Sequence, residues 1–263
     1  MSPPCPLGIC DGGGWIDDEA TATVTACRCR PQLVAARRAR SLSATIPRRY
    51  RGVSFERPPV TEMPRPQVDV VRRYVRRLDE RLDEGRGLWF FGSVGTGKTT
   101  LAMLVSRHAL DARRTVAIYS LPRLLAEIRE TFEDVRPGAY TSLIDRLTDV
   151  DLLHVDDLGA EKTSPWVLEQ LYAIVNARYE AERSMVVTTN LDRDALAAQI
   201  GERTVSRLEE MCEVCPLLGR DRRRFEAVDR RLGDVVDGAE RSAVEALHGD
   251  DATTPGPPDL RLA

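Results

Sequence analysis

The run Gly92-Ser93-Val94-Gly95-Thr96-Gly97-Lys98-Thr99 constrains the fold of this chain more than any other stretch. It fits the pattern G-x-x-x-x-G-K-[ST] at every fixed position. An apolar run, Leu88–Phe91, precedes it, and a helix-forming run, Thr100–Val105, follows it. A strand, a glycine loop and a helix in this order form a phosphate-binding loop, in which backbone N–H groups and the helix N-terminus converge on phosphate oxygens. The alternative, a glycine-rich turn with a chance lysine, does not account for the flanking strand and helix.

The loop predicts a nucleoside triphosphate site with Mg²⁺. Lys98 is long enough to reach the β and γ phosphates, and Thr99 offers a hydroxyl to the metal ion. We expect the nucleotide to be bound by the loop and the first helical residues, which are Gly92, Ser93, Val94, Gly95, Thr96, Gly97, Lys98, Thr99 and Thr100.

Around the loop, strand and helix patterns alternate, as an α/β domain with a parallel sheet requires. The five predicted strands are Leu88–Phe91, Thr115–Tyr119, Asp151–Val155, Met185–Thr188 and Cys212–Leu217. Helices are predicted at about Thr99–Ala112, Leu121–Glu133, Pro165–Ala181 and Arg193–Glu210, and an amphipathic helix at Gln67–Asp83 leads into the first strand. We place this core at residues 67–225.

Polar residues follow the third and fourth predicted strands. Asp156 and Asp157 end the third strand, and an apolar strand that delivers an acid to a phosphate loop is the Walker B arrangement. We expect Asp156 to hold Mg²⁺ and Asp157 to orient or deprotonate the attacking water. Asn190 follows the fourth strand, where its amide could position that water; alternatively, Asn190 or Asp192 caps the next helix.

Arg203 and Arg207 are four residues apart and share one face of a predicted helix. One of them is expected to meet a phosphate, and the neighbouring subunit could supply that phosphate, as it does for an arginine finger. The alternative is that both form surface ion pairs with the glutamates of the same segment, Glu202, Glu209 and Glu210.

The N-terminal 30 residues predict a metal module. Cys5, Cys10, Cys27 and Cys29 are four of the six cysteines, and tetrahedral Zn²⁺ needs four such ligands brought together by tight turns. Residues Gly12–Gly14 can supply one turn. So short a segment cannot bury a core of its own, so that zinc would replace that core. Four free thiols on a disordered leader are the alternative.

The rest of the chain is typical of a cytoplasmic protein. No run approaches the roughly 20 apolar residues that span a bilayer, and the N-terminus lacks a signal-peptide pattern. In that compartment disulfides are not expected, so Cys212 and Cys215 are interpreted as packed thiols. His154 lies in an apolar strand and is also expected to be packed rather than metal-bound.

Charge is distributed unevenly. The formal net charge of −3 predicts no nucleic-acid binding by the chain as a whole, but eight arginines and no acid lie between Arg28 and Arg51. Within the basic linker, residues 31–66, Arg37, Arg38 and Arg40 could touch nucleic-acid phosphates or an acidic partner, or could be solvated. Residues 226–263 form an acidic tail that we expect to be largely disordered, with no chemistry assigned to it.

Four motifs in this order carry a family resemblance: Gly92–Thr99, Asp156–Lys162 with Trp166, Thr188–Leu191 and Gly201–Leu208. Together they resemble the DnaC/DnaI-type helicase loaders and the related IstB transposition ATPases, a branch of the AAA+ superfamily, over roughly residues 45–225. The resemblance implies an oligomeric ATPase with a P-loop AAA+ core, a parallel five-stranded sheet and no full helical lid. It also implies Asn190 as sensor 1 and Arg207 as the arginine finger, with Arg203 close behind.

The same resemblance implies the partners. An extra helix within Leu121–Leu147 would face single-stranded DNA, with contributions from Arg123, Arg129, Arg136 and Tyr140. The cysteine module favours a loader, whose partner is the replicative DNA helicase. An IstB-like helper, whose partner is a transposase, is the alternative. A nucleotide-switched adaptor with little turnover is a third possibility, because Asp157 replaces the glutamate common in the superfamily and is one methylene shorter.

Overall fold

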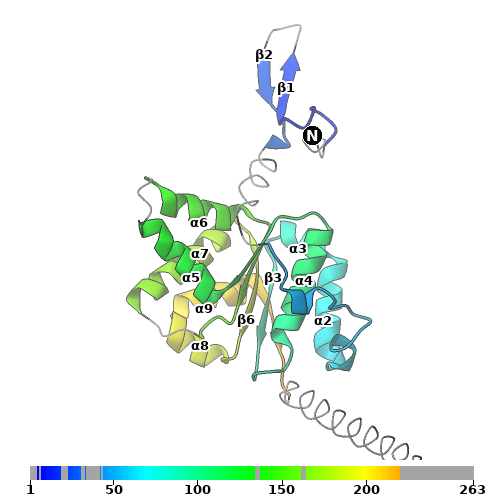
Figure 1. Cartoon of the computed structure of the whole chain (residues 1–263), viewed down its shortest axis with the longest axis vertical. Coiled ribbons are helices and arrows are strands. Elements are labelled where there is room, and N and C mark those ends of the chain that lie inside the picture. The colour runs from blue at the N-terminus through cyan, green and yellow to red at the C-terminus, as the bar shows by residue number, and fades with distance from the viewer. Residues whose placement is uncertain are drawn as a thin grey trace, which may run out of the picture. The chain divides into compact units, whose positions relative to one another are not determined.

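The structure is a computed structural model that describes residues 5, 7–18, 23–30, 33, 42, 44–133, 137–160 and 164–219. All of them belong to the first of two units into which the chain divides, residues 1–220 and 221–263 (Figure 1). The arginines predicted to contact nucleic acid from the linker, Arg37, Arg38 and Arg40, lie outside the described residues, as do Arg136, the acidic tail and the region where a helical lid would follow the last strand.

The core is a five-stranded parallel sheet, as predicted. Its strands are β3 (Gly87–Phe91), β4 (Val116–Ser120), β5 (Leu152–Asp156), β6 (Ser184–Thr189) and β7 (Cys212–Pro216). Their order across the sheet is β4-β5-β6-β3-β7. The strand before the glycine loop therefore lies between β6 and β7, and β6 separates it from β5. β3, β4, β5 and β6 are buried along nearly their whole length and consist of near-continuous apolar runs, which is why the sequence identified them. The edge strand β7 was also predicted, although Glu213 and Val214 on it are exposed.

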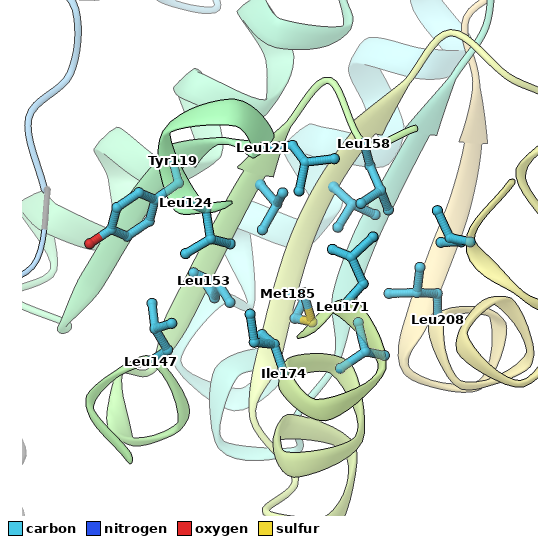
Figure 2. Close-up of a cluster of buried hydrophobic side chains, with 14 of the residues drawn as sticks. Tyr119, Leu121, Leu124, Leu147, Leu153, Leu158, Leu171, Ile174, Met185 and Leu208 are labelled. Atoms are coloured by element: carbon cyan, nitrogen blue, oxygen red, sulfur yellow. The ribbon is translucent and has the colours of Figure 1, made fainter. Parts of the chain in front are cut away.

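Helices cover both faces of the sheet (Figure 1). On one face, α2 (Arg65–Arg76), α3 (Leu78–Asp83) and α4 (Lys98–Asp111) contribute to one apolar cluster. On the other face, a second cluster is formed with α5 (Leu121–Glu133), α6 (Ala139–Asp149), α7 (Pro165–Glu180), α8 (Arg193–Ile200) and α9 (Glu202–Met211). Figure 2 shows this second cluster, in which Leu124, Leu153 and Leu171 are at most 3% exposed. Burying each such side chain contributes about 1.5–3 kcal/mol.

Two predicted helices are each split in the structure. The predicted helix Gln67–Asp83 is α2 followed by α3, and Arg77 between them leaves the helical region with φ −114° and ψ 31°. The predicted helix Arg193–Glu210 is α8 followed by α9, with Gly201 between them at φ 91°. The apolar spacing continues through both breaks, so periodicity does not reveal them. The segment Leu121–Leu147, for which the resemblance implies an extra helix, contains α5 and most of α6, which continues to Asp149.

A buried arginine fixes the connection between α6 and the sheet. Arg178 on α7 is fully buried, and its guanidinium donates to the carbonyls of Thr148 at 3.2 Å and Val150 at 3.0 Å. Burial lowers the pKa of Arg178 to about 9. The five N–H donors of a guanidinium can satisfy several carbonyls that a helix end leaves unpaired, which holds the start of β5 in place.

The N-terminal module contains an antiparallel hairpin that was not predicted. Its strands are β1 (Trp15–Asp18) and β2 (Thr23–Ala26). Gly12 and Gly14 have φ of 95° and 82°, which agrees with the predicted glycine turn before the hairpin. The guanidinium carbon of Arg30 lies 3.5 Å from the centroid of the Trp15 ring and covers its face.

Short 3-10 turns, η1 (Arg48–Tyr50) and η2 (Val60–Glu62), lead from the linker into the core. Val60 is 1% exposed, so this part of the linker is packed rather than solvated. Within the described part of the chain, no helix has the length and apolarity needed to cross a membrane.

Candidate nucleotide site and cysteine cluster

The glycine loop connects β3 to α4 through backbone conformations that favour glycine. Gly92, Gly95 and Gly97 have φ of 140°, 77° and 100°. A Cβ atom on Gly92 would lie 2.2 Å from the carbonyl oxygen of Leu217, and one on Gly97 would lie 2.3 Å from Cε of Met63. The positive φ therefore favours glycine at both positions, and the approach of the Leu217 backbone also requires it at Gly92.

Lys98 is folded back against the loop that it follows. Its side chain is 5% exposed, and Nζ donates to the carbonyls of Gly92 at 2.8 Å and Ser93 at 2.7 Å. Thr96 Oγ1 donates to the same Ser93 carbonyl at 2.9 Å. The loop thus holds an ammonium at the amino end of α4, where unpaired N–H groups and the helix dipole also attract anions. These donors fit a polyphosphate.

The register of the sheet brings the predicted acids to the same edge as the loop. Val155 pairs with Val187, and Phe91 pairs with Thr189. The carboxyl ends of β3, β5 and β6 therefore meet, and ligands of open α/β sheets bind outside this edge. Asp156 is at the end of β5 and Thr99 is in the first turn of α4. A carboxylate and a hydroxyl are oxygen ligands that Mg²⁺ prefers, so the residues present fit this ion.

Thr188 organises the two acids, a role that the sequence analysis did not assign. This threonine of β6 is fully buried. Its Oγ1 donates to Asp156 Oδ1 at 2.6 Å and accepts from the backbone N–H of Asp157 at 2.9 Å. The only sequence signal for it was its place in Thr188-Thr189-Asn190, in which Asn190 was the predicted site residue.

The same contacts hold Asp157 in an unusual backbone conformation. Its φ is 59°, in the left-handed region, which costs a non-glycine residue about 1–2 kcal/mol. Thr188 also holds the next residue, because its backbone carbonyl accepts a hydrogen bond from Leu158 N at 2.7 Å. β6 therefore fixes the direction in which the chain leaves β5.

Asn190 and Asp192 differ in their contacts. Asp192 caps α8, because its Oδ1 accepts from Ala195 N at 2.9 Å. Asn190 is exposed and directly follows β6, next to the strand that carries the loop. The capping alternative therefore applies to Asp192, and Asn190 lies at the edge where a water-positioning amide is expected.

His154 is packed, as expected. It is fully buried on β5, and its Nδ1 lies 2.9 Å from Ser106 Oγ on α4. Burial lowers the pKa of His154 to about 3, so the ring is neutral at physiological pH.

Arg207 stacks on two tyrosines of α7. Its guanidinium carbon lies 4.9 Å from the Tyr172 ring centroid and 5.6 Å from that of Tyr179, whereas Arg203 is exposed. Neither arginine forms an ion pair with another described residue, because Glu202 and Glu209 pair with Arg193. The predicted alternative of surface ion pairs with the local glutamates is therefore not found within residues 164–219.

Both arginines line one surface pocket of about 510 Å³ that contains no residue of the glycine loop. Its lining residues are Tyr172, Tyr179, Glu202, Arg203, Ser206, Arg207 and Glu210. Lys98 is therefore not among the residues that line this pocket.

The four N-terminal cysteines converge. The sulfur atoms of Cys5, Cys10, Cys27 and Cys29 all lie within 4.8 Å of one another, and those of Cys10 and Cys29 are 3.5 Å apart. Tetrahedral Zn–S bonds of about 2.3 Å would separate neighbouring sulfur atoms by roughly 3.8 Å. The cluster therefore has the size of a four-thiolate zinc site.

The environment of the thiols also fits a cation. The backbone N–H of Cys10 lowers the pKa of Cys5 to about 6, and Ile9 N also donates to its sulfur, at 3.4 Å. Burial raises the pKa of Cys29. Because several thiolates cannot share so small a volume without a positive charge, the cluster is suited to a metal ion.

The second cysteine pair has no such arrangement. Cys212 and Cys215 are three residues apart on β7, so their side chains lie on opposite faces of the sheet. Cys212 belongs to the apolar cluster on one face and Cys215 to that on the other. Both are buried free thiols, as predicted.

A comparison with protein families identifies the core. The model of the IstB-like ATP-binding proteins matches residues 73–224, which is more than half of the 263-residue chain. The chain belongs to this family. The match begins within α2 and includes the glycine loop, both acids and Arg207.

Curated relatives of this family member include helicase loaders. The replicative helicase loader DnaC of Escherichia coli (strain K12) is 26% identical over 137 residues, which cover 52% of this chain and 54% of that protein. DnaC of Buchnera aphidicola subsp. Baizongia pistaciae is 30% identical over 119 residues, covering 45% of this chain and 48% of that protein. The chain thus spans about half the length of these relatives.

Solved structures confirm the AAA+ fold. A crystal structure of the DnaC helicase loader has a TM-score of 0.57 and 25% identity, and the match covers 65% of this chain and 99% of that one. The replication initiator DnaA bound to AMPPCP and single-stranded DNA has a TM-score of 0.52 at 22% identity, over 65% of this chain and 51% of that one, and is similar in fold alone. The predicted P-loop α/β core with a five-stranded parallel sheet is confirmed.

Proposed function

We propose that this family member is an ATPase that loads or remodels a replicative DNA helicase on single-stranded DNA. One observation carries the proposal: the loop with buried Lys98 and the carboxylate of Asp156 held by Thr188 lie at one edge of a sheet whose fold is that of the DnaC loader. A polyphosphate donor set beside an oxygen ligand for Mg²⁺ is what ATP hydrolysis requires.

In the proposed reaction, residues 92–100 bind ATP, with Lys98 on the β and γ phosphates. Thr99 and Asp156 would hold Mg²⁺, which when bound neutralises developing phosphate charge. Asp157 orients or deprotonates the attacking water, and Asn190 helps to position it.

We further propose that the last catalytic group comes from a neighbouring protomer in an AAA+ oligomer. Arg207, with Arg203 close behind, would stabilise the transferring phosphoryl group of that neighbour, as arginine fingers do. Three observations support this assignment: both arginines face one surface pocket, that pocket excludes the chain's own glycine loop, and neither arginine is neutralised by a described acid.

An exposed aromatic group supports the proposed contact with single-stranded DNA. Phe132 at the end of α5 is 59% exposed, and its ring centroid lies 5.2 Å from that of Tyr140 and 6.3 Å from that of Trp166. Arg129 lies over the Trp166 ring at 4.8 Å. Aromatic rings and arginine planes are surfaces on which bases stack. Arg123, also on α5, is exposed and would contact phosphates.

The cysteine module, residues 1–30, would bind Zn²⁺ and select the helicase partner. The linker (31–66), the ATPase core (67–225) and the tail (226–263) complete the proposed organisation of a cytoplasmic protein. The fit of four sulfur atoms within 4.8 Å supports the zinc site.

The primary test is Lys98→Ala, measured for ATP binding, for ATP hydrolysis with and without single-stranded DNA, and for helicase loading. We expect all three to be lost, because the substitution removes the ammonium that lies against the loop. Arg76→Ala, an exposed arginine on α2, is the control and should retain wild-type values. Hydrolysis and loading by Lys98→Ala at wild-type rates would refute the proposal.

A second candidate is an IstB-like helper of transposition, which the family match itself favours. Pull-downs from the native cell with ATP and with ADP separate the two: a replicative helicase supports loading, and a transposase without helicase supports the alternative. The third candidate, a nucleotide-switched adaptor, would bind ATP with negligible turnover even when DNA is present.

A further inference from the structure

We infer that His154 is a positioning residue for Asp156, and that it couples the two residues proposed to hold Mg²⁺. This inference rests on the proposed function of the site. His154 touches neither the nucleotide loop nor a surface, and the reaction proposed above does not use it.

The geometry places His154 between the helix after the loop and the acidic end of β5. His154 and Asp156 are two residues apart on one strand, so their side chains lie on the same face of the sheet. Ser106 on α4 lies on that face, with Oγ 2.9 Å from His154 Nδ1. On the other side of the ring, Nε2 lies 4.0 Å from Asp156 Oδ1.

The unpartnered ring nitrogen points to the carboxylate. His154 is fully buried, and Nε2 has no hydrogen-bond partner among the described residues. A buried polar nitrogen without a partner is costly, so natural proteins retain few of them, and those that persist need an explanation. Here the nearest acceptor is the group that would hold the metal ion.

One tautomer of the neutral ring is consistent with this arrangement. If Ser106 donates its hydroxyl to Nδ1, the single ring proton is on Nε2 and faces the carboxylate. The other tautomer would direct a lone pair at the negatively charged oxygen in a dry environment, which is unfavourable. The carboxylate therefore favours the tautomer with the proton on Nε2, and in that tautomer Ser106 donates to Nδ1.

These contacts distinguish the two oxygens of Asp156. Oδ1 accepts from Thr188 Oγ1 at 2.6 Å and also faces His154 Nε2. Oδ2 forms no hydrogen bond with any other described residue, and it is the oxygen left for a cation. Oδ1 thus has one hydrogen bond, from Thr188, and one ring nitrogen that faces it at 4.0 Å. Both favour one orientation of the carboxylate, which is how residues around a metal site orient its ligands.

The same contacts connect both proposed ligands of Mg²⁺. Thr99 is in the first turn of α4, and Ser106 lies seven residues, or two turns, further along that helix. The chain Ser106–His154–Asp156 thus fixes the helix that carries one ligand against the strand that carries the other. A shift of α4 would be transmitted through the imidazole to the carboxylate.

The test uses two substitutions of different reach in the full-length chain. The amide nitrogen of Gln extends to about the position of Nε2 in histidine, whereas that of Asn reaches only the position of Nδ1. Binding of ATP is measured as a function of Mg²⁺ concentration, and in EDTA, together with the thermal midpoint of each variant. Hydrolysis is not needed for this readout.

The measured quantity is the Mg²⁺ concentration that gives half of the maximal enhancement of ATP binding. We expect His154→Asn to raise it about tenfold or more, as happens when a group that orients a metal ligand is removed. Affinity in EDTA should not change. His154→Gln should recover most of the Mg²⁺ dependence. Ser106→Ala, which is conservative in a helix, should shift it in the same direction by a smaller factor and provides the test if the histidine variants do not fold.

Failure of the inference and failure of the proposed function are distinguishable. If wild-type protein shows no Mg²⁺-dependent ATP binding, the proposed function is wrong, and the inference with it. The wild-type protein can show Mg²⁺-dependent ATP binding while folded His154→Asn and Ser106→Ala need the same Mg²⁺ concentration as wild type. In that case only the inference is overturned. Equal loss of thermal stability in the Asn and Gln variants, with unchanged Mg²⁺ dependence, would mean that His154 merely packs.

Discussion

At the scale of single residues, one hydroxyl has more influence on the candidate site than its position in the sequence indicates. Thr188 holds a side chain, Asp156, and a backbone, that of Asp157, at the same time. Hydrogen bonds to charged groups contribute about 1.5–3 kcal/mol, and a buried N–H left without a partner costs about 1–3 kcal/mol. Thr188 therefore affects both the proposed chemistry and the stability of the chain.

We predict that Thr188→Val, which keeps the shape and removes the hydroxyl, lowers the ATPase rate by tenfold or more and the free energy of unfolding by about 1–3 kcal/mol. ATP affinity in EDTA should be nearly unchanged, because the loop is intact. Steady-state hydrolysis and urea denaturation measure the two effects. Thr189→Val, the adjacent buried hydroxyl, is the matched control and should retain the ATPase rate; equal rates in the two variants would contradict the role of Thr188.

At the scale of elements, the conformation of the glycine loop depends on two segments that contact it, one before α2 and one after β7. Gly92 faces the backbone carbonyl of Leu217, and Gly97 faces the flexible end of Met63. A side-chain end can move aside, whereas a backbone that is hydrogen-bonded to β3, as Leu217 N is to the Phe91 carbonyl at 2.7 Å, cannot. The loop therefore contacts a fixed backbone at Gly92 and a movable side chain at Gly97.

We predict that Gly92→Ala destabilises the chain more than Gly97→Ala, although both impose a left-handed backbone on alanine at a cost of about 1–2 kcal/mol. Met63→Ala should partly rescue Gly97→Ala, and no side-chain substitution should rescue Gly92→Ala. Thermal and urea unfolding measure this difference in Gly92→Ala, Gly97→Ala, Met63→Ala and the Met63→Ala/Gly97→Ala double variant. Equal destabilisation by the two glycine substitutions would contradict the backbone contact.

The cysteine cluster is the second element that can be tested by itself. We predict that a zinc chelator, or Cys27→Ser, makes residues 1–30 sensitive to proteolysis and releases about one zinc ion per chain, because metal binding supplies the folding energy of so small a module. ATP binding by the core should persist. Metal analysis below about half a zinc ion per chain in the untreated protein would contradict the zinc site.

At the scale of the whole molecule, the proposed arginine fingers lie in a different pocket from the glycine loop of their own chain. Lys98 and the acids lie at one sheet edge, whereas the pocket with Arg203 and Arg207 excludes the loop. Stacking on Tyr172 and Tyr179 holds Arg207 without neutralising it, since cation–π contacts leave the charge available. This arrangement agrees with the proposal that Arg207 meets a phosphate bound by a neighbouring protomer.

We predict complementation between two inactive variants. Lys98→Ala lacks a working loop and Arg207→Ala lacks the arginine, so each alone should hydrolyse ATP at least about 10³-fold more slowly than wild type. In mixed oligomers, hydrolysis should return at interfaces where a Lys98→Ala protomer supplies Arg207 to the intact loop of an Arg207→Ala protomer. Repeating the mixture with Arg203→Ala identifies which arginine acts; no recovery in any mixture would contradict an arginine in trans.

The sequence by itself determined the local elements and the class of fold. The four strands that are buried along nearly their whole length are continuous apolar runs, and the phosphate loop is fixed by glycines close together in the chain. These strands, Gly92–Thr99 and the acids at the end of β5 could therefore be predicted. Cys5, Cys10, Cys27 and Cys29 were also recognisable, because metal ligands are few and chemically distinct. These signals are local, so they can be recognised without knowing which segments pack against one another.

Only the tertiary structure decided which side chains act together. Thr188 meets Asp156 across 32 residues of sequence, and Ser106 meets His154 across 48. Arg207 lies against Tyr172 because α7 and α9 pack together. No periodicity of 2 or 3.6 residues encodes such contacts, because they depend on strand order, register and the direction of the chain at breaks such as Gly201. The sequence therefore specified the parts of a nucleotide site, and packing of distant segments specified how those parts are held.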